Sequence, residues 1–253
     1  MNLRTLYGFH AVTVRLKTAP LTIVELHLDS TRRDARMRAF VERARAAGAR
    51  IVDSDDAQLR RLCGASQHQG VVARVSPLPQ RHSLDDILDE AAARGGAPAL
   101  VLALDGVTDP HNLGACLRSA DAAGVQAVLA PKDHAVGLNA TVSKVASGAA
   151  ETVPYLMVTN LARALGELQD RGLRVIGTSD DAPRTLYEAD LRGPVALVLG
   201  AEGSGLRQLT RRTCDELVRI PMHGAVESLN VSVATALCLY EAVRQRAERA
   251  PAR

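Results

Sequence analysis

Aromatic side chains are scarce in this chain of 253 residues, which has no tryptophan, two phenylalanines and four tyrosines. This scarcity excludes a surface that stacks many nucleobases on aromatic rings. Lysine is also rare, since only three of the 31 basic residues are lysines. Arginine suits bidentate contacts with phosphate, but a GC-rich coding sequence that also favours alanine explains the same bias.

Cysteines are few, and their spacing carries no metal or disulfide pattern. The four of them lie far apart with no C-x-x-C pair, at Cys63, Cys116, Cys214 and Cys238. This argues against a zinc knuckle or a disulfide framework and favours the reducing cytoplasm, with no metal. No apolar run approaches the roughly 18 residues that span a bilayer, and residues 1–15 show no signal-peptide pattern, so we expect no membrane partner.

Charge is distributed unevenly along the chain. Residues 1–75 carry thirteen Lys or Arg against seven Asp or Glu, a net charge of +6, whereas residues 76–253 carry 18 basic and 21 acidic residues. The asymmetry favours a module for a polyanion at the N-terminal end. A solvated helix face that happens to be rich in arginine explains it equally well.

The periodicity predicts two α/β domains. Residues 1–75 alternate short strands and helices, including a helix at 32–47 capped by Ser30 or Thr31. Residues 76–98 hold three prolines and two glycines around one short helix and are the expected linker. Residues 99–253 alternate apolar strands with helices, which predicts a parallel sheet covered on both faces. Its expected strands are 99–104, 127–130, 174–177, 195–199 and 217–220.

The first junction with unusual residues follows the strand 99–104. Asn112 is suited to cap the next helix, and Arg118 lies one helical turn beyond Gly114. Ligands bind at the carboxyl ends of strands in open α/β sheets, so Arg118 is a candidate site residue. A capped helix with Arg118 paired to Asp121 or Asp105 is the structural alternative.

Two further junctions complete the candidate site. Residues 199–206 form a glycine-rich turn around Glu202, which does not match the dinucleotide fingerprint but exposes backbone amides. Residues 220–234 run from Ile220 through Ser228 and Asn230, both good N-cap types, into the last helix. The structural alternatives are a simple turn at residues 199–206 and a simple helix cap at Ser228 or Asn230. Because all three are strand–loop–helix junctions of one domain, we expect them to converge at one edge of the sheet.

Taken together, three motifs resemble a known family. They are N-x-G-x-x-x-R at 112–118, G-A-E-G at 200–203 and I-P-M…S-L-N-V-S-x-A at 220–234. In this order they resemble the SpoU/TrmH-like RNA 2′-O-ribose methyltransferases of the knotted SPOUT superfamily, over about residues 99–246. Segments 6–12 and 67–70 resemble the family's N-terminal substrate-binding domain, which is similar to a small ribosomal protein fold. Residues 105–124 look most like the bacterial enzymes that methylate a guanosine of 23S ribosomal RNA.

The resemblance implies an activity and a set of residues. It implies methyl transfer from S-adenosylmethionine to a guanosine 2′-hydroxyl of large-subunit ribosomal RNA, without a metal, by a homodimer whose C-terminal domain holds a trefoil knot. It also gives Arg118 the central catalytic role, sometimes as general base. Arginine stays protonated in proteins, so we expect Arg118 either to stabilise the developing alkoxide or to gain basicity only beside the RNA phosphate. Glu202 is the chemically easier base if it lies within reach of the hydroxyl. The implied catalytic residues are Arg118, Asn112, Glu202, Ser228 and Asn230, and the implied cofactor contacts are Gly200, Ile220 and Leu229.

Other functions compete with this hypothesis. A tRNA ribose methyltransferase, or a ribosomal RNA enzyme that confers antibiotic resistance, shares all three motifs. A non-catalytic RNA-binding assembly factor on the same scaffold is disfavoured by the intact Arg118 and Glu202. A nucleotide-binding α/β enzyme acting on a small molecule leaves the basic N-terminal third unexplained.

Overall fold

The chain is divided into two compact units in the computed structural model, which describes residues 3–76, 83–93 and 95–247. Unit 1 is Met1–Arg81 with Leu138–Thr152, and unit 2 is His82–Gly137 with Val153–Arg253. The second segment of unit 1 is therefore an excursion of the chain between two strands of unit 2. The expected boundaries at residues 75 and 99 do not anticipate this excursion. Part of the expected linker, residues 77–82 and 94, lies outside the described residues.

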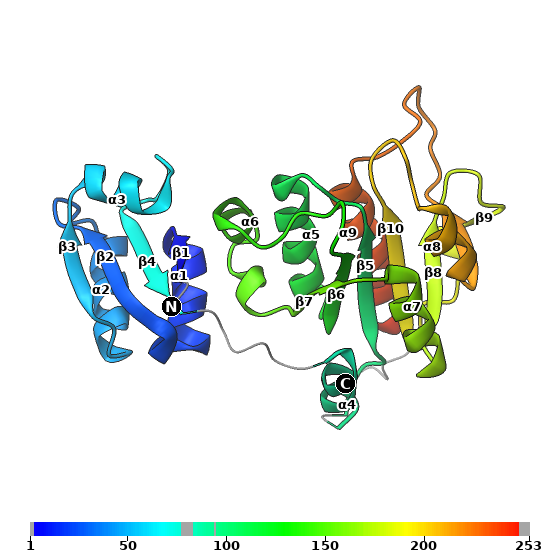
Figure 1. The fold of residues 1–253 in the computed structure, drawn as a ribbon, viewed down its shortest axis with the longest axis horizontal. Helices are drawn as coiled ribbons and strands as arrows, with labels where there is room; N and C mark the ends of the chain where they lie inside the picture. Colours follow the sequence, from blue (N-terminus) through cyan, green and yellow to red (C-terminus); the bar gives the residue numbers. More distant parts are fainter. Residues whose placement is uncertain (1–2, 77–82, 94, 248–253) are drawn as a thin grey trace. The chain divides into compact units, whose positions relative to one another are not determined.

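Unit 1 is built on a four-stranded mixed sheet of order β1-β4-β2-β3, in which β2 and β3 are parallel (Figure 1). Apolar residues of α1 and α2 cover it, with Phe9 and Phe40 in contact edge to face. Its elements are β1 (Arg4–Tyr7), α1 (Phe9–Thr18), η1 (Pro20–Thr22), β2 (Ile23–Asp29), α2 (Ala35–Ala46), β3 (Ile51–Ser54), α3 (Asp56–Cys63), β4 (Val71–Val75), α6 (Ala140–Val145) and η2 (Ala149–Glu151).

The start of α2 corrects one expectation. Asp34, not Ser30 or Thr31, caps this helix, because its carboxylate accepts a hydrogen bond of 3.1 Å from the amide of Met37. The backbone amide and hydroxyl of Thr31 instead donate to Asp29 at 2.9 and 2.7 Å. The chain around Thr31 is therefore a turn stabilised by a side chain, and the helix begins three to four residues later.

Unit 2 contains a seven-stranded sheet of order β7-β6-β5-β10-β8-β11-β9, in which every strand pair is parallel. The predicted parallel sheet is thus confirmed, although the two short edge strands β7 and β9 were missed. The elements are α4 (Leu84–Ala93), β5 (Leu100–Asp105), α5 (Pro110–Ala122), β6 (Ala127–Pro131), β7 (Tyr155–Val158), α7 (Leu161–Asp170), β8 (Arg174–Thr178), β9 (Arg184–Thr185), η3 (Leu186–Glu188), β10 (Val195–Gly200), α8 (Gln208–Thr213), β11 (Glu216–Arg219) and α9 (Val231–Ala247).

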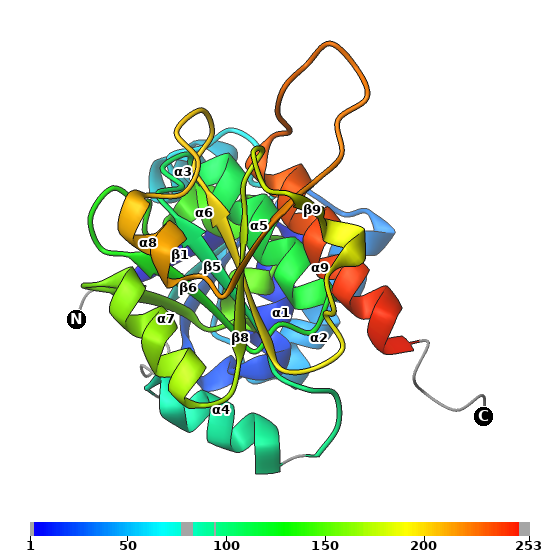
Figure 2. The same cartoon turned by 90° about the vertical axis from the view of Figure 1, so that its right-hand side faces the viewer.

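Helices cover both faces of the large sheet, as the continuous apolar strands require. Figure 2 shows α7 and α8 on one face and α5 with α9 on the other. Val101 and Val198 pack against α7 in one core cluster, which also includes Leu88 of α4. The helix expected within the linker is therefore part of unit 2. No helix in the described ranges combines the length and apolar character that a membrane crossing needs.

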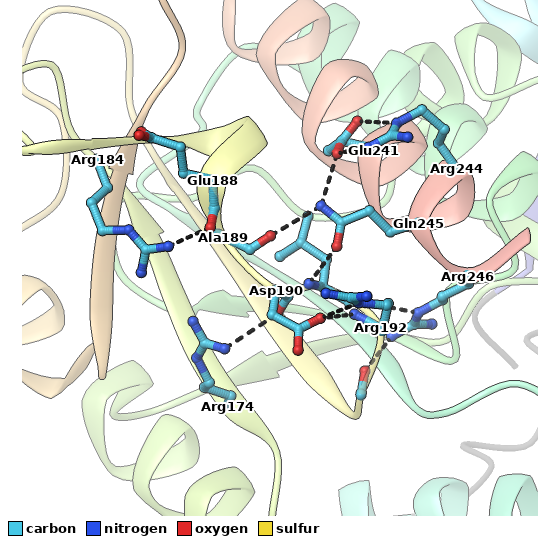
Figure 3. A network of polar contacts seen from close by, with 12 residues as sticks. Arg174, Arg184, Glu188, Ala189, Asp190, Arg192, Glu241, Arg244, Gln245 and Arg246 are labelled. Carbon is cyan, nitrogen blue, oxygen red and sulfur yellow. Dashed lines mark hydrogen bonds and ion pairs between the residues drawn. The ribbon is translucent and has the colours of Figure 1, made fainter. Parts of the chain in front are cut away.

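Polar contacts fasten the last turns of α9 to the chain that precedes β10 (Figure 3). Gln245 donates to the carbonyl of Ala189 at 3.0 Å and accepts from the amide of Leu191 at 2.8 Å. Arg246 donates to four backbone carbonyls, those of Pro98, Ala99, Leu191 and Gly193. One half-buried guanidinium thus fixes α9 to the start of β5 and to the loop before β10.

Candidate active site

Three side chains from separate junctions meet at one carboxylate oxygen. Oε1 of Glu202 accepts hydrogen bonds from Asn112 Nδ2 at 3.2 Å, from Asn230 Nδ2 at 2.7 Å and from the backbone amide of Val231 at 3.2 Å. Asn230 Nδ2 also lies 2.9 Å from Asn112 Oδ1, which closes the network. Residues that are far apart in the chain are thus joined where β5 and β10 end, the edge at which ligands bind in parallel sheets.

Asn112 is free to join this network because another residue caps its helix. Asp109 accepts hydrogen bonds from the amides of His111 and Asn112 at 3.3 and 3.0 Å, and Pro110 occupies the first helical position. The expectation that Asn112 caps α5 was wrong. Its side chain stands in the first turn of the helix and donates across to the glycine-rich turn.

Asn230 has both of the roles considered for it, as a cap of the last helix and as a residue of the site. Its Oδ1 accepts from the amide and the hydroxyl of Ser232, at 2.9 and 2.6 Å, as a residue at a helix N-terminus does. Its Nδ2 meanwhile reaches Glu202 and Asn112. The start of α9 is therefore fixed to the carboxylate by one amide side chain.

The turn that carries Glu202 folds back on itself. A Cβ atom added at Gly200 would lie 2.1 Å from the carbonyl carbon of Gly205, so glycine is required there. Ala201 and Gly205 form an isolated antiparallel bridge that closes the turn. The backbone of the turn is exposed beyond the end of β10, and this leaves its polar groups available to a ligand.

A buried carboxylate supports this turn, one that the sequence analysis considered only as a partner of Arg118. Asp105 ends β5, is 1% exposed, and accepts a hydrogen bond of 3.0 Å from the amide of Arg207. The Nε atom of Arg207 lies 3.2 Å from the other carboxylate oxygen. A charged residue at the end of an apolar strand was the available signal. Asp105 connects the end of β5 to the chain that leaves the glycine-rich turn.

Two predicted catalytic residues lie outside the network. Arg118 is exposed on α5 and makes no hydrogen bond or ion pair with any described residue, so neither Asp121 nor Asp105 neutralises it. Ser228 is exposed in the loop before α9. Ile220 and Leu229 are half-buried, and Leu229 is adjacent to Asn230 in the chain. The geometry therefore brings together Asn112, Glu202 and Asn230.

Thiol chemistry is disfavoured at three positions. Burial raises the pKa of Cys116 to about 11, and it raises those of Cys214 and Cys238 to about 12. These groups are neutral thiols near pH 7, whereas a cysteine nucleophile needs a lowered pKa. Cys116 instead pairs with Thr235 at 3.4 Å, between α5 and α9.

Fold and site define a two-part α/β protein with a carboxylate–amide cluster at the carboxyl edge of a parallel sheet. Residues 99–240 match the SpoU rRNA Methylase family, and residues 5–81 match the model described as RNA 2′-O ribose methyltransferase substrate binding. The chain belongs to the SpoU rRNA methylase family. The resemblance seen in the three motifs is thus confirmed.

Relatives match over nearly the whole chain. A protein of Ralstonia nicotianae named 23S rRNA (guanosine-2′-O-)-methyltransferase RlmB is 60% identical over 96% of each chain. The protein of that name from Pseudomonas aeruginosa is 54% identical over 95% of this chain and 96% of its own. A crystal structure of an RNA 2′-O ribose methyltransferase is similar with a TM-score of 0.79 and 29% identity, covering 96% of this chain and 88% of that one.

Proposed function

We propose that this protein transfers a methyl group from S-adenosylmethionine to the 2′-hydroxyl of a guanosine in 23S ribosomal RNA, in the cytoplasm. Unit 1 is the RNA-binding part and unit 2 the catalytic part. The observation that carries the proposal is the Glu202 cluster, which joins residues of all three family motifs. The high identity to relatives named for this reaction supports the substrate.

The residues around the glycine-rich turn fit the cofactor. The glycine at position 200 lets the turn close on Gly205, and the exposed residues 202–205 offer their backbone polar groups to a ligand. Ile220 and Leu229 add half-buried apolar surface at the ends of β11 and of the loop before α9. Backbone groups suit the edges of an adenine, and apolar side chains suit its faces. S-adenosylmethionine, when bound, supplies an electrophilic methyl group on a sulfonium sulfur.

The chain's own residues then orient the hydroxyl and handle its proton. Three hydrogen bonds hold Glu202 through Oε1, and no described residue bonds to Oε2, which is available to accept the proton of the ribose hydroxyl. The permanent charge of Arg118 stabilises the negative charge that develops on the oxygen. Asn112, Asn230 and Ser228 position the substrate around these two groups.

Labelled methyl transfer tests the proposal directly. The protein is incubated with labelled S-adenosylmethionine and either a 23S ribosomal RNA transcript or a tRNA pool, and the modified nucleotide is mapped. We expect label on one guanosine ribose of the 23S transcript. Label in tRNA would show that tRNA, and not 23S ribosomal RNA, is the substrate. RNA binding without any transfer would favour the assembly-factor hypothesis.

A trefoil knot in unit 2 is part of the proposal, because the strand order supports threading. Strand β11 lies between β8 and β9, and the connection 179–183 between those two strands passes its carboxyl end. The amide of Ser179 donates to the carbonyl of Val218, and Arg219 donates to that of Ala182 at 2.6 Å. The chain reaches β11 from α8 on one face and continues to α9 on the other (Figure 2).

The homodimer forms through α9. Val233, Leu237 and Tyr240 are 48%, 39% and 50% exposed, and their spacing of four and three residues places them on one face of the helix. A contiguous apolar stripe of this kind is typical of a subunit interface. An ordinary solvent-exposed helix face would be polar.

We expect Leu237→Asp to convert the dimer to a monomer, because it buries a charge in the interface. The molar mass in solution, measured by light scattering after size exclusion, gives the result. The matched control is Leu209→Asp, since Leu209 is a 60% exposed leucine on α8. A Leu237→Asp protein with the mass of the wild type would refute this interface.

A further inference from the structure

Two guanidinium groups lie against one aromatic ring in unit 1. The Cζ atoms of Arg32 and Arg36 are 5.0 and 4.4 Å from the ring centroid of Phe9. The ring is buried and packs edge to face on Phe40, so it is a rigid support. Each cation is attracted to the ring, but the two repel each other. Asp34 pairs with Arg32, whereas Arg36 has no ion pair among the described residues.

The loop 67–69 adds polar amide groups beside these two cations. Gln69 Oε1 accepts from the amide of Phe9 at 3.2 Å, and the carbonyl of Gln69 accepts from Arg32 at 2.6 Å. Gln69 has a φ of 57°, which turns the backbone so that both contacts form. Gln67 and Gln69 are exposed. Their amide groups are thus presented beside the guanidinium pair by a loop that is fixed at both Phe9 and Arg32.

Lys144 adds a third cation at the far end of the same loop. Its Nζ donates to Gln67 Oε1 at 2.8 Å and lies 5.6 Å from the ring centroid of Tyr7. Its segment is anchored on α1, since a Cβ at Gly148 would lie 2.3 Å from Val14. Lys144 is therefore a fixed member of unit 1, although it is distant from the other cations in the chain.

We propose that these five residues, the glutamine-loop surface, bind the ribose–phosphate backbone of the RNA substrate. The surface consists of Arg32, Arg36, Gln67, Gln69 and Lys144. The inference rests on the proposed function and adds where unit 1 holds the RNA. Guanidinium groups bind phosphate through paired N–H groups, lysine binds it as a point charge, and glutamine amides bond to phosphate or a 2′-hydroxyl. The neighbouring rings of Tyr7 and Phe9 are buried, so they stack on no base.

Helix α2 provides a matched control for the charge itself. Arg36 is at one flank of the buried face of the helix, and Arg38 and Arg45 are at the other, because residues 36 and 38 differ by about 200° around the axis. All three are exposed. Arg38→Gln with Arg45→Gln therefore removes the same charge as Arg36→Gln with Lys144→Gln, but from the opposite side of the helix.

The experiment measures how the affinity of the full chain for a 23S ribosomal RNA transcript depends on salt. Each phosphate contact contributes a slope of about 0.7 to 0.9 in a plot of log affinity against log salt concentration. We expect Arg36→Gln/Lys144→Gln to lower the slope by about 1.4 to 1.8 and the control pair to leave it unchanged. Arg36→Lys/Lys144→Arg keeps both charges, and we expect it to retain the wild-type slope.

Two results would overturn the inference. One is an unchanged slope in the Arg36→Gln/Lys144→Gln protein, and the other is an equal decrease in the control pair, which would mean that affinity follows net charge alone. Methyl transfer by the wild type to the same transcript is measured as well, because it tests the proposed function separately from the glutamine-loop surface. Transfer with an unchanged slope refutes the surface alone, whereas a lowered slope without transfer refutes the function and leaves the surface.

Discussion

Arg118→Ala is expected to lower kcat for methyl transfer by about 10²- to 10³-fold, the loss typical when one group that stabilises an oxyanion is removed. The side chain is exposed and bonds to no described residue, so its loss removes no contact that stabilises the fold. We therefore expect an unchanged melting temperature and an unchanged affinity for S-adenosylmethionine. Steady-state kinetics on the 23S transcript measure kcat, calorimetry of cofactor binding measures the affinity, and thermal unfolding measures the melting temperature.

A control and a conservative variant complete this test. Arg212→Ala removes another exposed arginine of unit 2, and we expect it to change kcat less than twofold. Arg118→Lys keeps the charge but loses the planar fork, so near-normal turnover would show that the fork has no catalytic role. A pH–rate profile of Glu202→Gln that matches the wild type would show that another group takes the proton.

The sequence predicts the large sheet well because its strands are buried on both faces. Runs such as 100–104 and 195–199 are apolar throughout, and this pattern is typical of parallel strands between helices. Strand β7 was missed because it has four half-buried residues at the edge of the sheet. Short edge strands lack the apolar run that marks a central one.

The site was predictable where the sequence holds a residue type that the local structure does not require. A carboxylate among glycines is such a case, and Glu202 is the centre of the cluster. The role of Asn112 was misread because two residues competed for the cap of α5. Pro110 was the overlooked signal, since proline favours the first helical position and identifies Asp109 as the cap.

The attachment of residues 138–152 to unit 1 could not be predicted from local patterns. It depends on Val14, Arg15 and Tyr7 meeting a segment that is remote in sequence. Propensity and periodicity report only on neighbours along the chain. The buried pair of Arg15 and Glu151 is the part of this attachment with the largest energetic consequence.

Glu151→Ala is expected to destabilise unit 1 by about 3 to 5 kcal/mol, because it leaves a buried cation without its partner. Arg15 and Glu151 are ion-paired, with side chains 1% and 6% exposed. Burial lowers the pKa of Arg15 and raises that of Glu151, and each partner's charge opposes the other's shift. Arg15 also donates to Thr22 and to the carbonyl of Ser76, so it cannot turn to water without breaking further bonds.

Hydrogen exchange of β1 and β4 amides measures the effect locally, which a chain of two units requires. The control is Arg60→Ala, which breaks the exposed Arg60–Asp56 pair of unit 1 and is expected to cost about 0.5 kcal/mol or less. The double variant Arg15→Met/Glu151→Leu replaces both charges with apolar groups, and we expect it to recover most of the loss. If Glu151→Ala costs no more than Arg60→Ala, the pair of Arg15 and Glu151 does not hold residues 138–152 on unit 1. If the double variant is as unstable as Glu151→Ala, the loss comes from packing around Arg15 rather than from an unpaired charge.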